Sequence, residues 1–97
     1  MVKAILIIYS ESLDGQLLEI LSGLGVTRYS KFPEVLGLGG HSEPHLNDNI
    51  WPGANCGLLI ATDEENKMKL LEKLRLFKNE NIKEGFKVFV LPVEEVI

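Results

Sequence analysis

Apolar residues follow two kinds of pattern along this chain, one typical of strands and one typical of helices. The run from Val2 to Tyr9 is apolar at both sets of alternating positions, which indicates a strand covered on both faces. Three further short runs, rich in branched or aromatic residues, predict strands over Thr27–Leu36, Asn55–Thr62 and Phe86–Val93. Pro33 lies inside the second strand, so we expect that strand at a sheet edge or a bulge.

Two intervening stretches have the three- and four-residue spacing of amphipathic helices. Their apolar positions are Leu13, Leu17, Ile20, Leu21 and Leu24 in the first, and Leu70, Leu71, Leu74 and Phe77 in the second. Ser10 or Ser12 can cap the start of the first helix, and Gly25 can end it in the left-handed conformation. Thr62, with Glu65 three residues later, predicts a capping box at the start of the second helix.

The elements follow one another as strand, helix, strand, strand, helix, strand, an order typical of the ferredoxin-like β-α-β-β-α-β fold. Residues 1–97 are therefore predicted to form one α+β domain with an antiparallel sheet and both helices on one face. The first and third strands should be central, with the other two at the edges. Because the first strand is also apolar on the opposite face, we expect other copies of the chain to cover that face.

Composition narrows the classes of function. The chain has 97 residues, a mass of 10.8 kDa and a formal net charge of −4. A nucleic-acid partner is not expected, because an acidic chain has no basic face to neutralise phosphates. The one cysteine, Cys56, excludes an internal disulfide and fits a reducing compartment, so we expect a cytoplasmic protein. The longest apolar run, residues 4–9, is too short to span a membrane, so membrane contact is expected only through a membrane-protein partner.

Residues 37–53 are the longest stretch without a strand or helix pattern, at 17 residues. A loop of this length is usually functional, so the candidate ligand and partner residues concentrate here. Gly37, Gly39 and Gly40 can let the backbone approach a ligand closely, although they also suit a tight turn at the end of a strand. Trp51 can stack on a ligand or contact a partner, or it can pin the loop to the body of the protein.

The same loop contains a candidate metal site. His41, Glu43 and His45 are spaced two residues apart, and Pro44 favours an extended conformation for the residue before it. In an extended segment these three side chains point the same way, and two imidazoles with a carboxylate suit zinc, copper or iron. The alternative is a polar, solvated loop.

Two segments resemble the PII nitrogen regulatory proteins. The segment from Lys87 to Val96 resembles their last strand, and Val35 to Gly39 resembles the end of their second strand, where the mobile T-loop begins. The resemblance implies a homotrimer whose sheets pack inward, an adenine nucleotide site between subunits, and a loop over residues 37–53 that docks on a regulated partner. Lys87 is the one residue that the resemblance carries over as a phosphate contact. With the loop residues Gly37, Gly39, Gly40, His41 and Ser42 it completes the set of candidate ligand contacts, and the loop positions available to a partner are Asn47, Asn49 and Trp51.

Departures from the family pattern mark this chain as a divergent, PII-like member. Glu84-Gly85-Phe86-Lys87 stands where the family has a Gly-Asp-Gly-Lys turn that holds phosphates. The arginine pair that follows the last strand in the family has no counterpart here, and the loop is shorter than a usual T-loop. If ATP binds, we therefore expect it to bind weakly.

Three classes of function follow from these observations. The first is a trimeric PII-like signalling protein that senses a small ligand, with an adenine nucleotide as candidate, and regulates a partner through its loop. The second is a metal-binding trimer similar to the CutA family, which would use the loop histidines and a divalent metal. The third is a small enzyme with His41 or His45 as general base. No complete catalytic set supports the third class, so we expect a protein that is not an enzyme.

Overall fold

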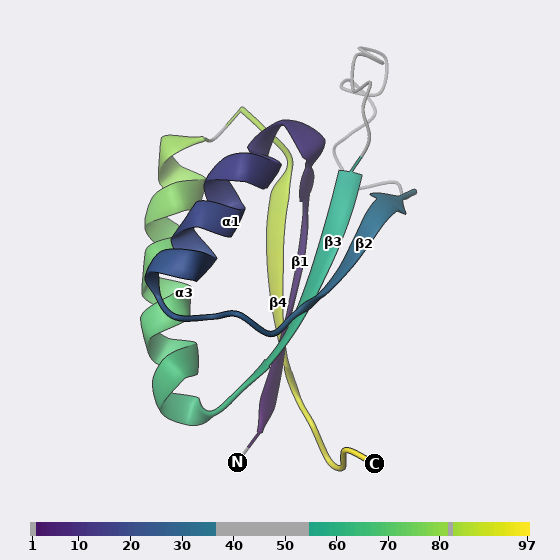
Figure 1. Ribbon diagram of the computed structural model, residues 1–97. Helices are drawn as coiled ribbons and strands as arrows, with labels where there is room; N and C mark the ends of the chain where they lie inside the picture. Colours follow the sequence, from purple (N-terminus) through teal and green to yellow (C-terminus); the bar gives the residue numbers. More distant parts are fainter. Residues whose placement is uncertain (1, 37–54, 82) are drawn as a thin grey trace.

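The computed structural model describes residues 2–36, 55–81 and 83–97. Its elements are β1 (Lys3–Ser10), the short 3-10 helix η1 (Glu11–Leu13), α1 (Asp14–Gly23), β2 (Ser30–Val35), β3 (Asn55–Thr62), α3 (Glu64–Glu80) and β4 (Phe86–Pro92). The strands form one antiparallel sheet in the order β2-β3-β1-β4. Both helices lie on one face of this sheet (Figure 1), so the predicted ferredoxin-like fold is confirmed.

The core lies between the helices and the side of the sheet that faces them. Ile5, Ile7 and Tyr9 of β1 are fully buried there, and they are paired across the sheet with Ile60, Leu58 and Cys56 of β3. The predicted stripes of the two helices cover them, with Leu17 and Leu21 from α1 and Leu70 and Leu74 from α3. Each such aliphatic side chain contributes about 1.5–3 kcal/mol by leaving water, so the apolar pattern of the sequence accounts for this layer.

The edge strand β2 is shorter than predicted. It begins at Ser30, because the residues from Val26 to Tyr29 cross the sheet outside the hydrogen-bonded ladder (Figure 1). Its pairing with β3 shifts register between Phe32 and Val35, which surrounds Pro33. The prediction that Pro33 lies at an edge or a bulge is therefore confirmed, because proline has no N–H to give to a ladder.

Two helix starts differ from the predicted caps. Ser10 caps η1 by accepting from the Ser12 N–H, and α1 begins directly after η1 without a side-chain cap. At α3 the prediction of Thr62 as cap is wrong: Asp63 caps this helix, and its Oδ1 accepts from the Asn66 N–H at 2.8 Å. Both residues can cap a helix, and β3 continues through Thr62, so the carboxylate one residue later is the first free acceptor.

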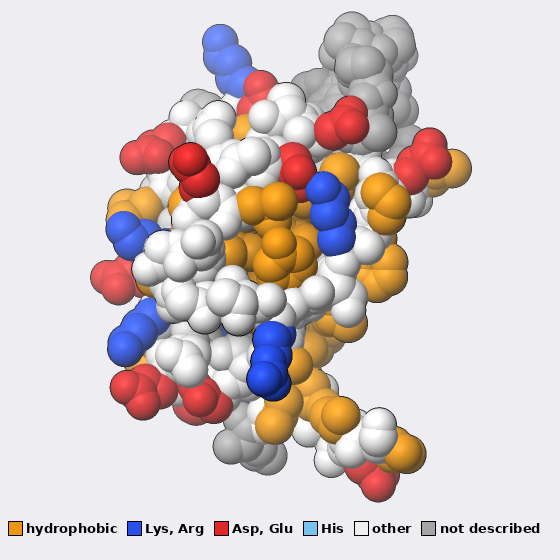
Figure 2. Space-filling model, viewed as in Figure 1, with side chains coloured by type: hydrophobic (Ala, Val, Ile, Leu, Met, Phe, Trp, Pro, Cys, Tyr) orange, Lys and Arg blue, Asp and Glu red, His pale blue; other side chains and the backbone are white. Residues whose placement is uncertain are grey.

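The sheet face opposite the helices is apolar and open in the single chain. Leu59, Phe89, Leu91 and Phe32 remain 38–46% exposed, and the outward positions of β1 are Leu6 and Ile8. Gly57 lets Phe32 and Val35 lie close over β3, since a Cβ there would approach both side chains at 3.4 Å. Figure 2 views the other side of the molecule, the side with the helices, where charged side chains cover α3 and apolar side chains show beside the edge strand β2. An exposed apolar face of this kind indicates an interaction surface.

Candidate functional site

A groove of about 460 Å³ lies at the end of the sheet where β3 passes into α3. It is lined by residues 24–28, by residues 60–63, and by Val2 and Asn66. Its lining is apolar at Val2, Leu24, Val26, Ile60 and Ala61, and it carries hydroxyl, amide and charged groups at Thr27, Arg28, Thr62, Asp63 and Asn66. An apolar lining with a few polar groups is typical of a small-molecule site.

The turn after α1 forms one wall of this groove. Gly25 has φ +79°, a left-handed value that favours glycine, and its N–H donates to Ser22 O at 3.0 Å. The Val26 N–H donates to Leu21 O at 2.8 Å, which closes the helix end. The turn sends the chain across the sheet, so Thr27 and Arg28 line the groove instead of continuing a strand. No motif in the sequence marks Thr27 or Arg28 as a site residue, although the predicted left-handed Gly25 is a signal for such a turn.

The opposite wall is the start of α3. Asp63 accepts from both the backbone and the side-chain amide of Asn66, at 2.8 and 3.1 Å. Glu64 and Glu65 add negative charge to the first turn. Among the described residues that line the groove, Arg28 is the single basic one. These charges leave the helix N-terminus poorly suited to a phosphate, so the groove fits an uncharged ring better than a polyphosphate.

Lys87, the one predicted ligand residue within the described part, lies far from this groove along the sheet. It is exposed on β4 and paired with Ile8 near the end of β1, whereas the groove includes Val2 at the start of β1. The predicted loop contacts lie outside the described residues: Gly37, Gly39, Gly40, His41, Ser42, Glu43, His45, Asn47, Asn49 and Trp51. Within residues 2–36, 55–81 and 83–97, no three His, Cys, Asp or Glu side chains gather to hold a metal ion.

The turn before β4 is built for packing and has a negative charge. The Ser10 N–H donates to Gly85 O at 2.9 Å, and Ser12 Oγ donates to Glu84 Oε1 at 2.9 Å. Phe86 is buried, with its ring in edge contact with Phe77 at 5.3 Å between centroids. Phe86, the first residue of β4, is therefore a core residue, and the carboxylate of Glu84 in the turn disfavours anions.

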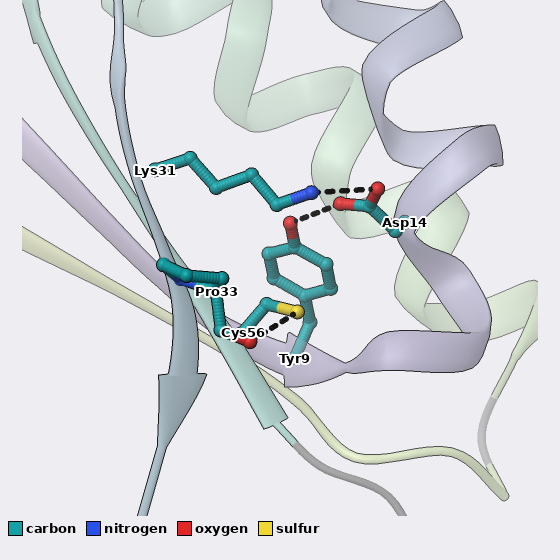
Figure 3. A network of polar contacts seen from close by, with 5 residues as sticks. All are labelled: Tyr9, Asp14, Lys31, Pro33 and Cys56. Atoms are coloured by element: carbon teal, nitrogen blue, oxygen red, sulfur yellow. Dashed lines mark hydrogen bonds and ion pairs between the residues drawn. The ribbon is translucent and has the colours of Figure 1, made fainter.

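A polar network joins the beginning of α1 to the sheet (Figure 3). Tyr9 Oη donates to Asp14 Oδ1 at 2.6 Å, and Lys31 Nζ donates to Asp14 Oδ2 at 2.9 Å. Burial, the hydrogen bond to Asp14 and the charge of that carboxylate raise the pKa of Tyr9 above its ordinary value. Burial opposes ionisation of Asp14, but the hydrogen bonds from Lys31 and Tyr9 outweigh it and lower the pKa of this carboxyl. The network thus holds an ionised carboxylate between β1, α1 and β2.

Cys56 is a core residue, as predicted. It is 2% exposed, and its Sγ donates to Pro33 O at 3.5 Å across the β2–β3 pair (Figure 3). Burial is the largest cause that raises the pKa of its thiol, so the side chain is neutral at physiological pH. Nucleophilic chemistry at Cys56 is therefore disfavoured.

The family model of the nitrogen regulatory protein P-II matches residues 2–97. The chain belongs to the P-II family. No curated protein sequence matches it. The resemblance to the PII proteins is thus confirmed over nearly the whole chain. Members of this family are regulatory signalling proteins.

Solved structures of PII-like proteins share the fold. CPII from Thiomonas intermedia K12, bound to ADP, AMP and bicarbonate, is 24% identical with a TM-score of 0.69, over 93% of this chain and 89% of that one. CPII bound to ADP and bicarbonate is 27% identical, with a TM-score of 0.69 over 92% and 82%. A PII-like signalling candidate from Thermus thermophilus is 22% identical, with a TM-score of 0.65 over 92% and 82%. None of the helices in the described part of this P-II member is long and apolar enough to cross a membrane.

Proposed function

We propose that this P-II family member is a trimeric regulatory protein that binds an adenine nucleotide in clefts between its subunits. The observation that carries the proposal is the groove between the α1–β2 crossing and the start of α3. Its apolar lining with hydroxyl and amide groups suits a heterocyclic base, and CPII, 24–27% identical, binds ADP and AMP. Binding changes the state of residues 37–53, which regulate a partner protein. The activity is a population shift and involves no chemical step.

The separation of Arg28 from Lys87 supports a site shared by two protomers. Within one chain, these two cations lie toward opposite ends of the sheet. A ligand whose base lies in the groove of one protomer reaches Lys87 of another only when the protomers lie side by side. The open sheet face supplies the surface for that assembly, because Leu59 and Phe89 are apolar and exposed there.

Calorimetry with AMP, ADP and ATP tests the nucleotide site. Arg28→Gln and Asn66→Ala should each weaken AMP or ADP binding and leave folding intact, because both residues are exposed on the rim. Lys69→Gln, on an exposed position of α3 outside the groove, is the matched control. Absence of binding for all three nucleotides would refute the proposed ligand class. A thermal shift with divalent metals instead would favour the alternative that rests on His41, Glu43 and His45.

Light scattering tests the trimer. The particle in solution should have three times the chain mass of 10.8 kDa, and Leu59→Lys should reduce the particle mass to that of a single chain. This variant should remain folded, because Leu59 is already 38% exposed in the isolated chain. Leu76→Lys is the matched control, since Leu76 is exposed on α3, away from the open sheet face. A folded monomer of the unmodified protein at micromolar concentration would contradict the assembly without excluding nucleotide binding.

A further inference from the structure

The free edge of β4 and the groove beside it form a second surface, separate from the nucleotide groove. β4 is the last strand of the sheet, and α3 lies beside it on the side away from β2 (Figure 1). A groove of about 220 Å³ between them is lined by Leu71, Leu74, Arg75, Lys78, Phe86, Val88 and Val90. It lies on the helix side of the sheet, so a trimer formed through the opposite face leaves it accessible.

Burial along this side of β4 decreases steadily. Phe86, Val88 and Val90 all face the helices, since they pair with Tyr9, Ile7 and Ile5 of the buried side of β1. Phe86 is 5% exposed, Val88 is half-buried and Val90 is 41% exposed. α3 therefore covers the beginning of β4 and leaves its second half open. An exposed valine on the helix-facing side of a sheet is available for contact with another element.

The backbone of the same residues is available for strand pairing. Gly85 O accepts from the Ser10 N–H, so it points toward β1, whereas Phe86 O accepts from Lys78 Nζ at 2.8 Å and points away from β1. Successive residues of a strand direct their backbone groups to opposite sides. The N–H and C=O groups of Val88 and Val90 thus point outward. Lys78 already protects the first carbonyl of this edge, and no strand in the described part of the chain pairs with the rest.

The charges of this groove have one sign. Arg75 and Lys78 are the charged residues that line it, in a chain whose net charge is −4. Within the described residues, no carboxylate forms an ion pair with Arg75. An apolar floor, outward backbone groups and two cations on one wall are complementary to an extended segment that has aliphatic and acidic side chains on one face.

We propose that the β4 edge binds an extended, acidic and aliphatic segment of a partner protein by strand addition. The segment pairs with the backbone of Val88 and Val90. Its aliphatic side chain contacts Leu71 and Val90, and its carboxylate binds Arg75.

The experiment titrates ¹⁵N-labelled protein with an acetylated, amidated peptide, Thr-Val-Thr-Glu-Thr-Val-Thr. The amides of Val88 and Val90 should shift and become protected from hydrogen exchange. Arg75→Glu should weaken binding at least about tenfold, because it replaces a charge-assisted hydrogen bond by repulsion. Lys73→Glu, an equal charge change on α3 outside the groove, should have little effect. Val90→Pro should abolish binding and preserve the fold, because its N–H points out of the sheet.

Three outcomes would overturn the proposal. The first is the absence of shifts in β4 at millimolar peptide. The second is equal weakening by Arg75→Glu and Lys73→Glu, which would indicate general electrostatic attraction. The third is full protection of the Val88 and Val90 amides without peptide, which would mean that another copy of the chain already occupies the edge. Each of these outcomes is separable from nucleotide binding, which calorimetry measures on the same variants.

Discussion

Removal of the Asp14 carboxylate should destabilise the protein more than removal of the lysine that pairs with it. Tyr9 is fully buried, and its hydroxyl donates to Asp14 at 2.6 Å. Asp14→Ala leaves that hydroxyl in the core without its acceptor, which costs about 1–3 kcal/mol. The lost ion pair adds about 0–1 kcal/mol, because the side chains of Lys31 and Asp14 are 35% and 25% exposed. We expect a total loss of about 1–4 kcal/mol in the free energy of unfolding.

Two variants separate these contributions. Lys31→Met removes only the partly exposed ion pair and should cost less than about 1 kcal/mol. Tyr9→Phe removes the donor, so Asp14→Ala should cost much less in that background than in the unmodified chain. For a domain of this size, about 2 kcal/mol corresponds to a decrease of roughly 8–16 °C in Tm.

Urea unfolding followed by circular dichroism measures these differences. All variants must be compared at one protomer concentration, because the stability of an oligomer depends on concentration. If Lys31→Met costs as much as Asp14→Ala, the ion pair and not the buried hydrogen bond carries the network. If the costs of Tyr9→Phe and Asp14→Ala simply add, the two side chains do not act together, and the reasoning is refuted.

Three further predictions concern caps, glycines and pH. Asp63→Ala should destabilise the protein by about 0.5–2 kcal/mol in the same urea assay, because Asp63 accepts a backbone N–H at the start of α3. Thr62→Ala should cost less, and a larger cost for Thr62→Ala would restore Thr62 as the cap. Gly25→Ala should cost about 1 kcal/mol, because the φ of Gly25 is +79°. Gly23→Ala should stabilise the protein by about 0.5–1 kcal/mol, because Gly23 lies in α1 with open space around it. Thermal melts in which the two variants shift Tm alike would contradict this difference. The pKa of Asp14 is lowered in the folded protein. The ionised carboxylate therefore contributes fully to the free energy of unfolding above its unfolded pKa of about 3.9, and this contribution is lost as pH falls through the lower folded pKa. The difference in stability between the unmodified protein and Asp14→Asn should disappear in acid, and a pH-independent difference would exclude this linkage.

The fold follows from the sequence because its pattern is consistent at every level. The apolar stripe of each helix marks the side that packs on the sheet. The two-sided apolar pattern of β1 indicates a central strand, and the proline of β2 indicates an edge strand. The order of the strands then follows from the alternation of elements. The segment from Lys87 to Val96 also identified the P-II family, which the family model confirms.

The groove could not be predicted from the sequence, because its walls come from segments distant along the chain. Val2, the turn at Gly25 and the start of α3 meet only when β1 and β3 pair and α1 packs over them. Arg28 was predicted inside a strand, where its side chain would have no special role. The left-handed turn and the crossing segment make it a rim residue.

The partners of individual polar groups were likewise decided by the tertiary structure. In the sequence Lys31 is one of several lysines and Asp14 one of several acids, and no local spacing pairs them. The packing of α1 against β2 brings their charges to 2.9 Å and places the Tyr9 hydroxyl beside them. Buried apolar positions repeat with the period of the helix or strand that contains them, so they can be identified in the sequence directly. A hydrogen bond or an ion pair requires two atoms within about 3 Å, and only the folded chain brings such atoms together.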